Sequence, residues 1–168
     1  MTIAEFDHLE PAQKRTLLLQ CCGSVTWANK IIAALPAEDL IDLLEIAEEQ
    51  WYACSKQDWQ EAFTHHPKIG DFSTLREKFK DTADWAEGEQ ASVKKATEAT
   101  LWELAEDNKA YEEKFGYIFI IFATGKSAEE MLSNLKARLQ NNAEDELKIA
   151  MEEQLKITKH RLEKLFTT

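Results

Sequence analysis

Residues 143–166 read AEDELKIAMEEQLKITKHRLEKLF, and this stretch decides the fold class of the 168-residue chain. Its apolar side chains recur every three or four positions, so they form one stripe along a helix. The stripe consists of Leu147, Met151, Leu155, Leu162 and Leu165. A helix of this length with one apolar face needs other helices to pack against.

The same spacing of three and four recurs in three stretches upstream. It is carried by Leu17, Leu18 and Cys21 in a first helix, by Leu40, Leu43, Leu44 and Ala47 in a helix from about Pro36 to Cys54, and by Val93, Ala96, Thr100, Leu101 and Leu104 in a third. The alternation typical of strands is absent, and so are internal repeats and Gly/Ser linkers. The sequence therefore predicts an all-α fold, a single-domain bundle of about eight helices over residues 1–168.

Two segments interrupt the helical pattern. In residues 65–71, HHPKIGD, Pro67 disfavours an α conformation at His66 and Gly70 permits conformations closed to other residues, so a turn between two helices is expected. Residues 115–122, FGYIFIIF, form a continuous apolar run after a helix. This run fits either a buried strand or a buried helix, and periodicity does not distinguish them.

Composition narrows the classes of partner. The formal net charge is -11 and the basic residues are scattered among acids, which argues against nucleic acid as a partner. No apolar run is long enough to span a membrane, and the N-terminal residues lack the layout of a signal peptide. Three cysteines, Cys21, Cys22 and Cys54, without CxxC spacing fit reduced thiols. We therefore expect a cytoplasmic protein.

His66 is the first candidate for chemistry. It precedes a rigid proline, so its imidazole projects from a fixed backbone, as suits a catalytic acid or base. Alternatively, it caps the helix that contains Trp59, Ala62 and Phe63. A metal site of His65, His66 and Asp71 is a third option, weakened by the lack of an HxxxH or HExxH pair.

Glu89 and Arg161 are further candidates. Glu89 lies near the start of a long helix, where an acid stabilises the helix dipole whether or not it has another role. Arg161 follows Ile157 by four residues and Gln154 by seven, which places it beside the apolar stripe and away from a solvated face. That solvated face consists of Glu152, Lys156, Lys159 and Glu163. A half-buried arginine needs a carboxylate, from the protein or from a ligand.

Gly125-Lys126-Ser127 matches the end of a P-loop but lacks its first glycine, since Ile120 stands there. Ser127 is better explained as a helix cap, with Glu130 completing a capping box.

Taken together, these segments resemble the OHCU decarboxylase family, where OHCU is 2-oxo-4-hydroxy-4-carboxy-5-ureidoimidazoline. His66-Pro67-Lys68-Ile69-Gly70-Asp71 is similar to the HP(R/K)IGD signature of the family, including the upstream Trp59 and Phe63. The resemblance extends from about Leu17 to the C-terminus through Cys22-Gly23-Ser24, Glu89-Gln90, residues 111–120, Gly125-Lys126-Ser127 and residues 157–162.

The resemblance implies a role for each matching residue. His66 and Glu89 are similar to the catalytic histidine and glutamate of the family, and Arg161 to its substrate-binding arginine. Further substrate contacts are implied for Pro67, Gln90 and the backbone of Phe119, Ile120 and Ile121. One departure is Ala86, where the family often has a serine three residues before the glutamate. Either one hydrogen bond to the substrate is then missing, or water or Ser92 supplies it.

The implied reaction is the cofactor-independent decarboxylation of OHCU to (S)-allantoin in uric acid (purine) degradation, by a protein that is commonly a homodimer in this family. No metal or other cofactor is expected, because the ring C=N bond of OHCU can accept the electron pair released with CO2. Arg, His and Glu side chains can hold a carboxylate and move protons. The alternative is a catalytically inactive helical protein-interaction module, and Ala86 is the feature that favours it.

Overall fold

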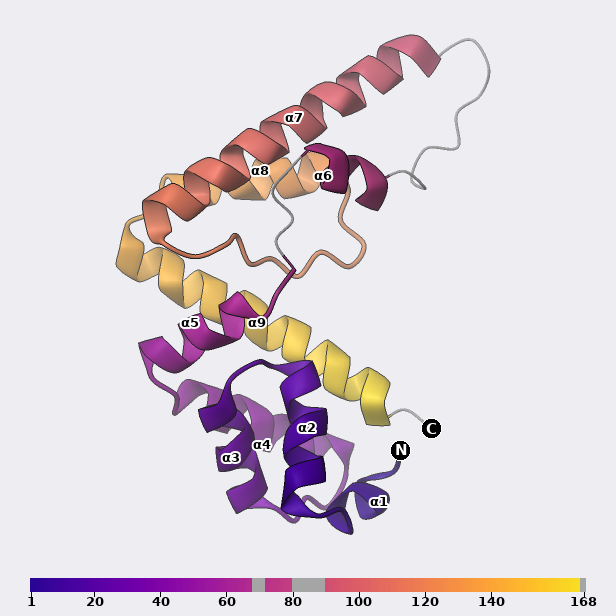
Figure 1. Ribbon diagram of the computed structural model, residues 1–168, viewed down its shortest axis with the longest axis vertical. Coiled ribbons are helices and arrows are strands. Elements are labelled where there is room, and N and C mark those ends of the chain that lie inside the picture. The colour runs from indigo at the N-terminus through magenta and orange to yellow at the C-terminus, as the bar shows by residue number, and fades with distance from the viewer. Residues whose placement is uncertain (68–71, 80–89, 167–168) are drawn as a thin grey trace. The chain divides into compact units, whose positions relative to one another are not determined.

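The computed structural model describes residues 1–67, 72–79 and 90–166, and side chains at 78 and 90–96 lie outside this description (Figure 1). Over the described residues the chain forms nine helices and no strand. The helices are α1 (Ile3–Asp7), α2 (Pro11–Cys21), α3 (Val25–Ala34), α4 (Leu40–Tyr52), α5 (Lys56–Thr64), α6 (Phe72–Lys78), α7 (Gln90–Phe115), α8 (Ala128–Leu139) and α9 (Ala143–Phe166). The predicted all-α class with about eight helices is confirmed.

Short polar side chains fix where several helices begin. Ser24, Asp39 and Ser55 precede α3, α4 and α5, and the side chain of each accepts a hydrogen bond from a main-chain N–H of the first turn. Ser127 does the same for α8, and the Glu130 side chain closes the predicted capping box. The Gly-Lys-Ser segment is therefore a helix start.

The contacts divide the chain into two units, residues 1–66 with 149–168, and residues 67–148. The first unit has a core in which Trp27 and Trp51 are almost fully buried. Their indole N–H groups donate to the main-chain carbonyls of Ala47 and Met151, both at 3.0 Å. These bonds satisfy the one polar atom of each ring, so both large side chains can be buried without loss of hydrogen bonding.

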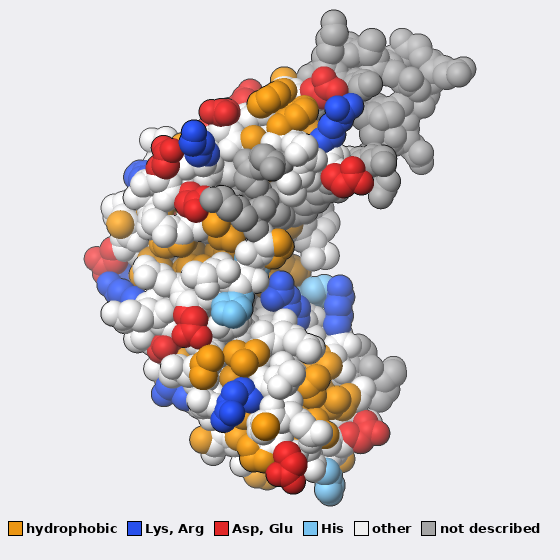
Figure 2. Space-filling model, in the orientation of Figure 1, with side chains coloured by type: hydrophobic (Ala, Val, Ile, Leu, Met, Phe, Trp, Pro, Cys, Tyr) orange, Lys and Arg blue, Asp and Glu red, His pale blue; other side chains and the backbone are white. Residues whose placement is uncertain are grey.

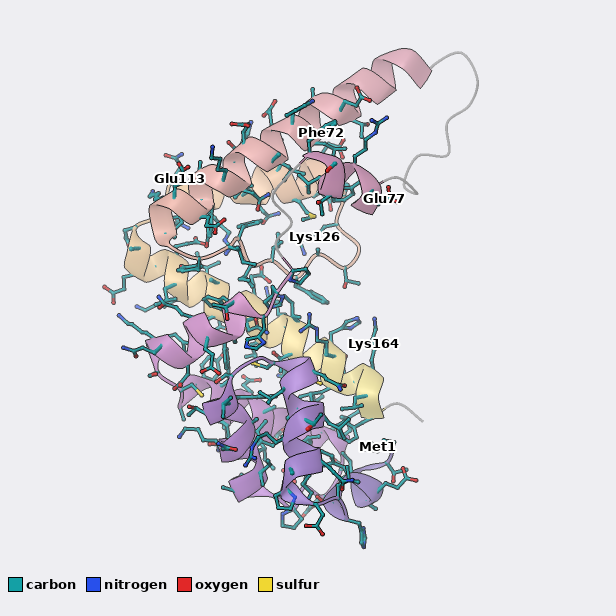
Figure 3. All side chains as sticks on the ribbon, in the orientation of Figure 1. Met1, Phe72, Glu77, Glu113, Lys126 and Lys164 are labelled. Atoms are coloured by element: carbon teal, nitrogen blue, oxygen red, sulfur yellow. The ribbon has the colours of Figure 1, made fainter. Side chains whose placement is uncertain are left out.

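The second unit has its own apolar core, on α6 with the residue that follows it, α7 and α8. Its buried members are Leu75, Phe79, Leu101, Leu104, Ala105, Tyr111, Ala128, Met131, Leu132 and Leu135. Helix α7 ends at Phe115, because Gly116 adopts a φ of 82°, a conformation that glycine accepts readily. The segment from Tyr117 to Ala123 then runs without regular secondary structure. Lys126, labelled in Figure 3, lies just before α8. Its ammonium group donates to the Phe122 carbonyl at 2.8 Å and ties the end of this segment to the start of α8.

The helix boundaries predicted from the sequence agree with the structure for some helices and not for others. The predicted helix over 143–166 coincides with α9, whereas the helix expected from about Pro36 to Cys54 is shorter, because Asp39 caps it and α4 begins at Leu40. The apolar run 115–122 is neither a strand nor a helix beyond Phe115, so both structures considered for it are wrong.

The surface bears out the charge pattern. On the face shown in Figure 2, acidic and basic side chains are interspersed and neither sign forms one continuous patch. Among the described residues no helix is both long and apolar enough to cross a bilayer.

Candidate active site

His66 lies just beyond the end of α5, where the backbone is fixed. His65 is the C-cap residue of α5, and the main-chain N–H of His66 donates to the Phe63 carbonyl at 3.3 Å. Phe63 is fully buried, which anchors this last turn. His66 is half-buried, and its imidazole points to α9: Nε2 of His66 and Oε1 of Gln154 are 2.5 Å apart. The side chain of His66 therefore contacts α9 and does not cap its own helix.

Burial lowers the pKa of His66 below its ordinary value of 6.5. The hydrogen bond with Gln154 opposes this effect, while the positive charge of Arg161 and the neighbouring His65 add to it. The net result is a lowered pKa, which favours the neutral form of the imidazole. Such a group can accept a proton or donate a neutral hydrogen bond.

Arg161 belongs to the same unit as His66 and is close enough for its charge to act on the imidazole. It is half-buried on α9, as its position beside the apolar stripe predicted. One guanidinium nitrogen, Nη1, donates to the main-chain carbonyl of Cys21 at 3.2 Å. Within the described ranges no carboxylate forms an ion pair with Arg161, so its remaining donors can receive an anionic ligand.

Gly23, in the segment Cys22-Gly23-Ser24, packs directly against His65. A Cβ built on Gly23 would lie 2.4 Å from Cγ and 2.5 Å from Cβ of His65. Only glycine leaves room for this approach. The two cysteines beside it are not reactive thiolates, because burial raises the pKa of Cys21 to about 11 and that of Cys22 to about 12.

Residues 119–121 belong to the second unit, in the irregular segment after α7. The main-chain carbonyl of Ile120 accepts a hydrogen bond from Nη1 of Arg138 at 2.6 Å. The guanidinium of Arg138 also stacks on Phe119, with Cζ 4.4 Å from the ring centroid. Arg138 thus fixes the backbone of the stretch that the sequence singled out for main-chain contacts.

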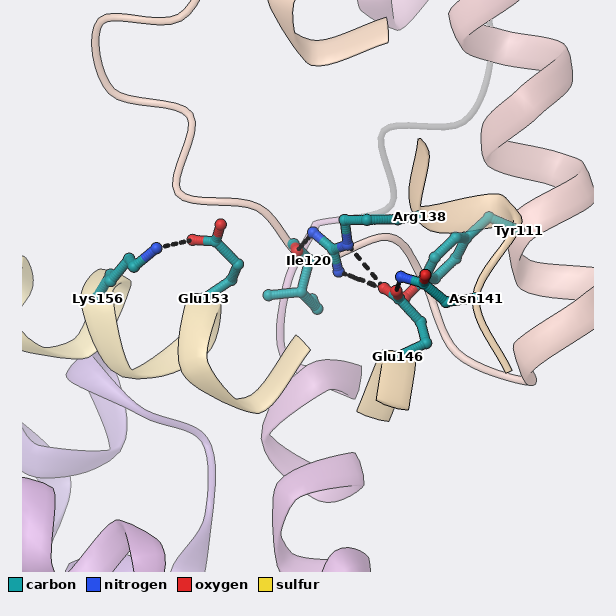
Figure 4. Close-up of polar contacts among 7 residues, drawn as sticks. All are labelled: Tyr111, Ile120, Arg138, Asn141, Glu146, Glu153 and Lys156. Carbon is teal, nitrogen blue, oxygen red and sulfur yellow. Dashed lines mark hydrogen bonds and ion pairs between the residues drawn. The ribbon is translucent and has the colours of Figure 1, made fainter. Parts of the chain in front are cut away.

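Arg138 is itself part of a buried polar cluster (Figure 4). Its Nε and Nη2 both contact Oε1 of Glu146, at 2.7 and 2.6 Å. Tyr111 donates its hydroxyl to the same oxygen at 2.5 Å, and Asn141 donates to Oε2 at 3.0 Å. Because Glu146 is fully buried and Arg138 is 6% exposed, each charge relies on the other for compensation.

The remaining predicted residues are placed only in part. Pro67 follows His66 and is exposed, and Gln90 is the first residue of α7, with its side chain outside the description. Glu89 and Ala86 lie outside the described residues, as does Asp71 of the considered metal site. No group of three His, Cys, Asp or Glu side chains suited to a metal occurs among the residues that the structure does describe.

Sequence reasoning missed two residues of this site, Gln154 and Thr158. Both are almost fully buried on α9, and they follow the buried Glu146 and Ala150 at intervals of four. A polar row at helical spacing beside an apolar stripe was the available signal. Lys159, expected on the solvated face, instead is half-buried and pairs with Glu48, so that placement was wrong.

Comparison with known proteins identifies the family of the chain. The family model for OHCU decarboxylase matches residues 7–163. A curated relative, the uric acid degradation bifunctional protein TTL of Arabidopsis thaliana, is 40% identical over 149 residues, 88% of this chain and 45% of the relative. The chain spans less than half the length of the curated relatives it matches.

Two solved structures share the fold. The crystal structure of an OHCU decarboxylase in the presence of (S)-allantoin is 36% identical, with a TM-score of 0.71 over 89% of this chain and 96% of that chain. The crystal structure of (S)-allantoin synthase, at 19% identity and the same TM-score of 0.71 over 96% of this chain and 53% of that chain, shows the fold alone. Since the family model covers nearly the whole chain, the chain belongs to the OHCU decarboxylase family.

Proposed function

We propose that the chain converts OHCU to (S)-allantoin with release of CO2, in the degradation of uric acid, and that it needs no cofactor. The observation that carries the proposal is the half-buried imidazole of His66, whose pKa is lowered by burial and by the nearby charge of Arg161, in a chain of the OHCU decarboxylase family. A relative crystallised in the presence of (S)-allantoin supports the choice of product.

The reaction requires few protein groups. The bond between the ring carbon and the carboxylate breaks, and its electron pair forms a double bond to the neighbouring ring carbon. The π pair of the ring C=N bond moves to nitrogen, which takes up a proton. The hydroxyl then gives up its proton to become the ring carbonyl, and the carbon that bears the ureido group receives one proton on one face.

Each group in the proposed site has a task in these reaction steps. The guanidinium of Arg161 holds the carboxylate or polarises a carbonyl of the ring. His66 exchanges a proton with the substrate, and Glu89 is the second acid/base group. Pro67, Gln90 and the backbone of residues 119–121 orient the ring, so that protonation occurs on one face.

The competing function is an inactive helical module that binds partner proteins through its acidic surface. Ala86, which replaces the serine common in the family, is the one residue in its favour. Loss of a single substrate hydrogen bond lowers affinity without removing the acid/base groups, so we favour the enzyme.

We further propose a homodimer in the cytoplasm. The three cysteines are free and buried, in keeping with a reducing compartment. Sedimentation equilibrium at several concentrations tests the dimer, and a monomer at all of them would contradict it.

The function is tested by adding the purified chain to freshly generated OHCU and following circular dichroism. The proposal predicts rapid appearance of the signal of the S enantiomer, with the same rate in a strong chelator. Racemic product at the uncatalysed rate would favour the inactive module. Activity lost to chelation and restored by zinc or manganese would favour a metal site at His65, His66 and Asp71.

A further inference from the structure

Thr158 and Gln154, one helical turn apart on α9, form a closed hydrogen-bond arrangement. The Thr158 hydroxyl donates to the main-chain carbonyl of Gln154 at 2.9 Å. Its oxygen is also 3.1 Å from Nε2 of Gln154. Because the single hydroxyl proton is already used, the Thr158 oxygen can only accept from Gln154, and the amide NH2 must face Thr158.

Cys22 completes the surroundings of this hydroxyl. The Thr158 hydroxyl forms a hydrogen bond with the Cys22 side chain, and burial raises the pKa of Cys22 to about 12, so the thiol keeps its proton at neutral pH. A protonated sulfur is only a weak acceptor, so the Thr158 proton stays with the main-chain carbonyl of Gln154. The Thr158 oxygen therefore remains the acceptor for the Gln154 amide.

The orientation of the Gln154 amide decides the state of His66. With its NH2 toward Thr158, Gln154 presents Oε1 to Nε2 of His66, at 2.5 Å. An amide oxygen only accepts hydrogen bonds, so Nε2 must carry the proton. In a neutral imidazole the other nitrogen, Nδ1, then has a free lone pair. Within the described part of the chain, no hydrogen-bond partner occupies Nδ1.

We propose that Gln154, oriented by Thr158, is a positioning residue that holds neutral His66 with its proton on Nε2 and so makes Nδ1 the atom that exchanges a proton with the substrate. This inference rests on the proposed decarboxylation. An amide suits the task better than a carboxylate, because a carboxylate would stabilise the charged imidazolium. The positive charge of Arg161 also disfavours the imidazolium, because like charges repel.

The first experiment reads the tautomer directly. The full chain is labelled with 15N-histidine, and a long-range 1H–15N correlation spectrum at neutral pH shows which ring nitrogen carries the proton. The His66 signals are assigned by their absence in His66→Asn. The proposal predicts a proton on Nε2. A proton on Nδ1, or an even mixture of the two forms, would overturn it.

The second experiment separates positioning from packing. Thr158→Ser keeps the hydroxyl and should retain the tautomer and kcat, whereas Thr158→Val keeps the shape, loses the hydroxyl and should lower kcat about 10- to 100-fold with little change in KM. Gln154→Glu should raise the pKa of His66 and move the acid limb of kcat/KM to higher pH. The matched control is Gln57→Glu on α5, an exposed glutamine, which should leave the pH profile unchanged. Equal kcat for Thr158→Val and Thr158→Ser would contradict the proposal.

The two proposals fail in different ways. A proton on Nε2 in a chain without OHCU turnover overturns the proposed function and leaves the tautomer assignment standing. Turnover by a chain with the proton on Nδ1 overturns this inference alone.

Discussion

Gly23 lies so close to His65 that a Cβ at this position would be 2.5 Å from the Cβ of the histidine. This atom is bound to the backbone and cannot rotate away, in contrast to the end of a flexible side chain. The contact joins the segment before α3 to the end of α5, one residue before His66. It explains in physical terms why Gly23 stands between Cys22 and Ser24.

We therefore expect Gly23→Ala to destabilise the chain by about 1–3 kcal/mol, the usual scale of overpacking, and to lower decarboxylation by displacing His66. Urea unfolding and the circular dichroism assay measure the two effects. The double variant Gly23→Ala/His65→Gly, which removes the clashing atoms, should recover part of the lost stability. Gly125→Ala is the control, since a Cβ there meets nothing within 4 Å and only its φ of 76° adds strain. Additive effects of the two substitutions would contradict a direct clash.

The sequence predicted those helices whose capping residues and apolar stripe lie within one short stretch of the chain. α9 coincides with its prediction because the stripe and its flanking residues lie within one stretch, and α8 begins at Ser127 because the capping box is local too. The conformation of residues 117–123 depends instead on Arg138, whose bond to Ile120 spans 18 residues. The contact between His66 and Gln154 spans 88 residues. Periodicity can mark Gln154 as a buried position of α9, but it does not say which distant residue each side chain meets, so a single sequence does not predict these two contacts.

The pKa of His66 gives a prediction for pH. Because burial and the charge of Arg161 lower this pKa in the folded state, the acid limb of kcat/KM should lie below pH 6.5. His65 and Gln154 are the other groups that act on this imidazole. An acid limb at or above that value would contradict a neutral His66.

Stability should respond to the same shift. As pH falls through 6.5, the unfolded chain binds a proton at this residue before the folded chain does, so the free energy of unfolding decreases toward lower pH. His66→Asn should remove this contribution, measured as a smaller difference in urea midpoint between about pH 7.5 and pH 5.5. His8→Asn, at an exposed histidine, is the control and should keep the wild-type difference.

The ion pair of Arg138 and Glu146 predicts a large effect on stability. Arg138→Met leaves a fully buried carboxylate without its partner and should cost about 3–5 kcal/mol in the free energy of unfolding. The double variant Arg138→Met/Glu146→Leu should lose much less than the sum of the single losses, because no unpaired charge remains. Lys136→Met, on the same helix, breaks the exposed pair with Glu103 and should leave the free energy of unfolding almost unchanged, because solvent screens this pair. Independent, additive losses would show that the pair is not coupled.

Arg161→Lys tests the anchoring role of the guanidinium. Lysine keeps the charge but not the planar fork, so substrate binding should weaken by about 1–3 kcal/mol, seen mainly as a higher KM. A fall in kcat as well would show that Arg161 also stabilises developing charge. Arg76→Lys, at an exposed arginine 3.9 Å from Glu98, is the matched control and should behave as wild type. Unchanged KM and kcat in Arg161→Lys would exclude Arg161 from the site.

The most direct test of the account is the turnover of OHCU by His66→Asn, followed by circular dichroism. Asparagine keeps some of the hydrogen bonding of histidine but cannot exchange a proton near neutral pH. We predict a rate of stereospecific product formation lower by about 10²- to 10⁴-fold, with substrate binding retained and the fold intact. Full stereospecific activity in His66→Asn would show that the histidine has only a structural role in its contact with α9, and the mechanism proposed for this chain would be wrong.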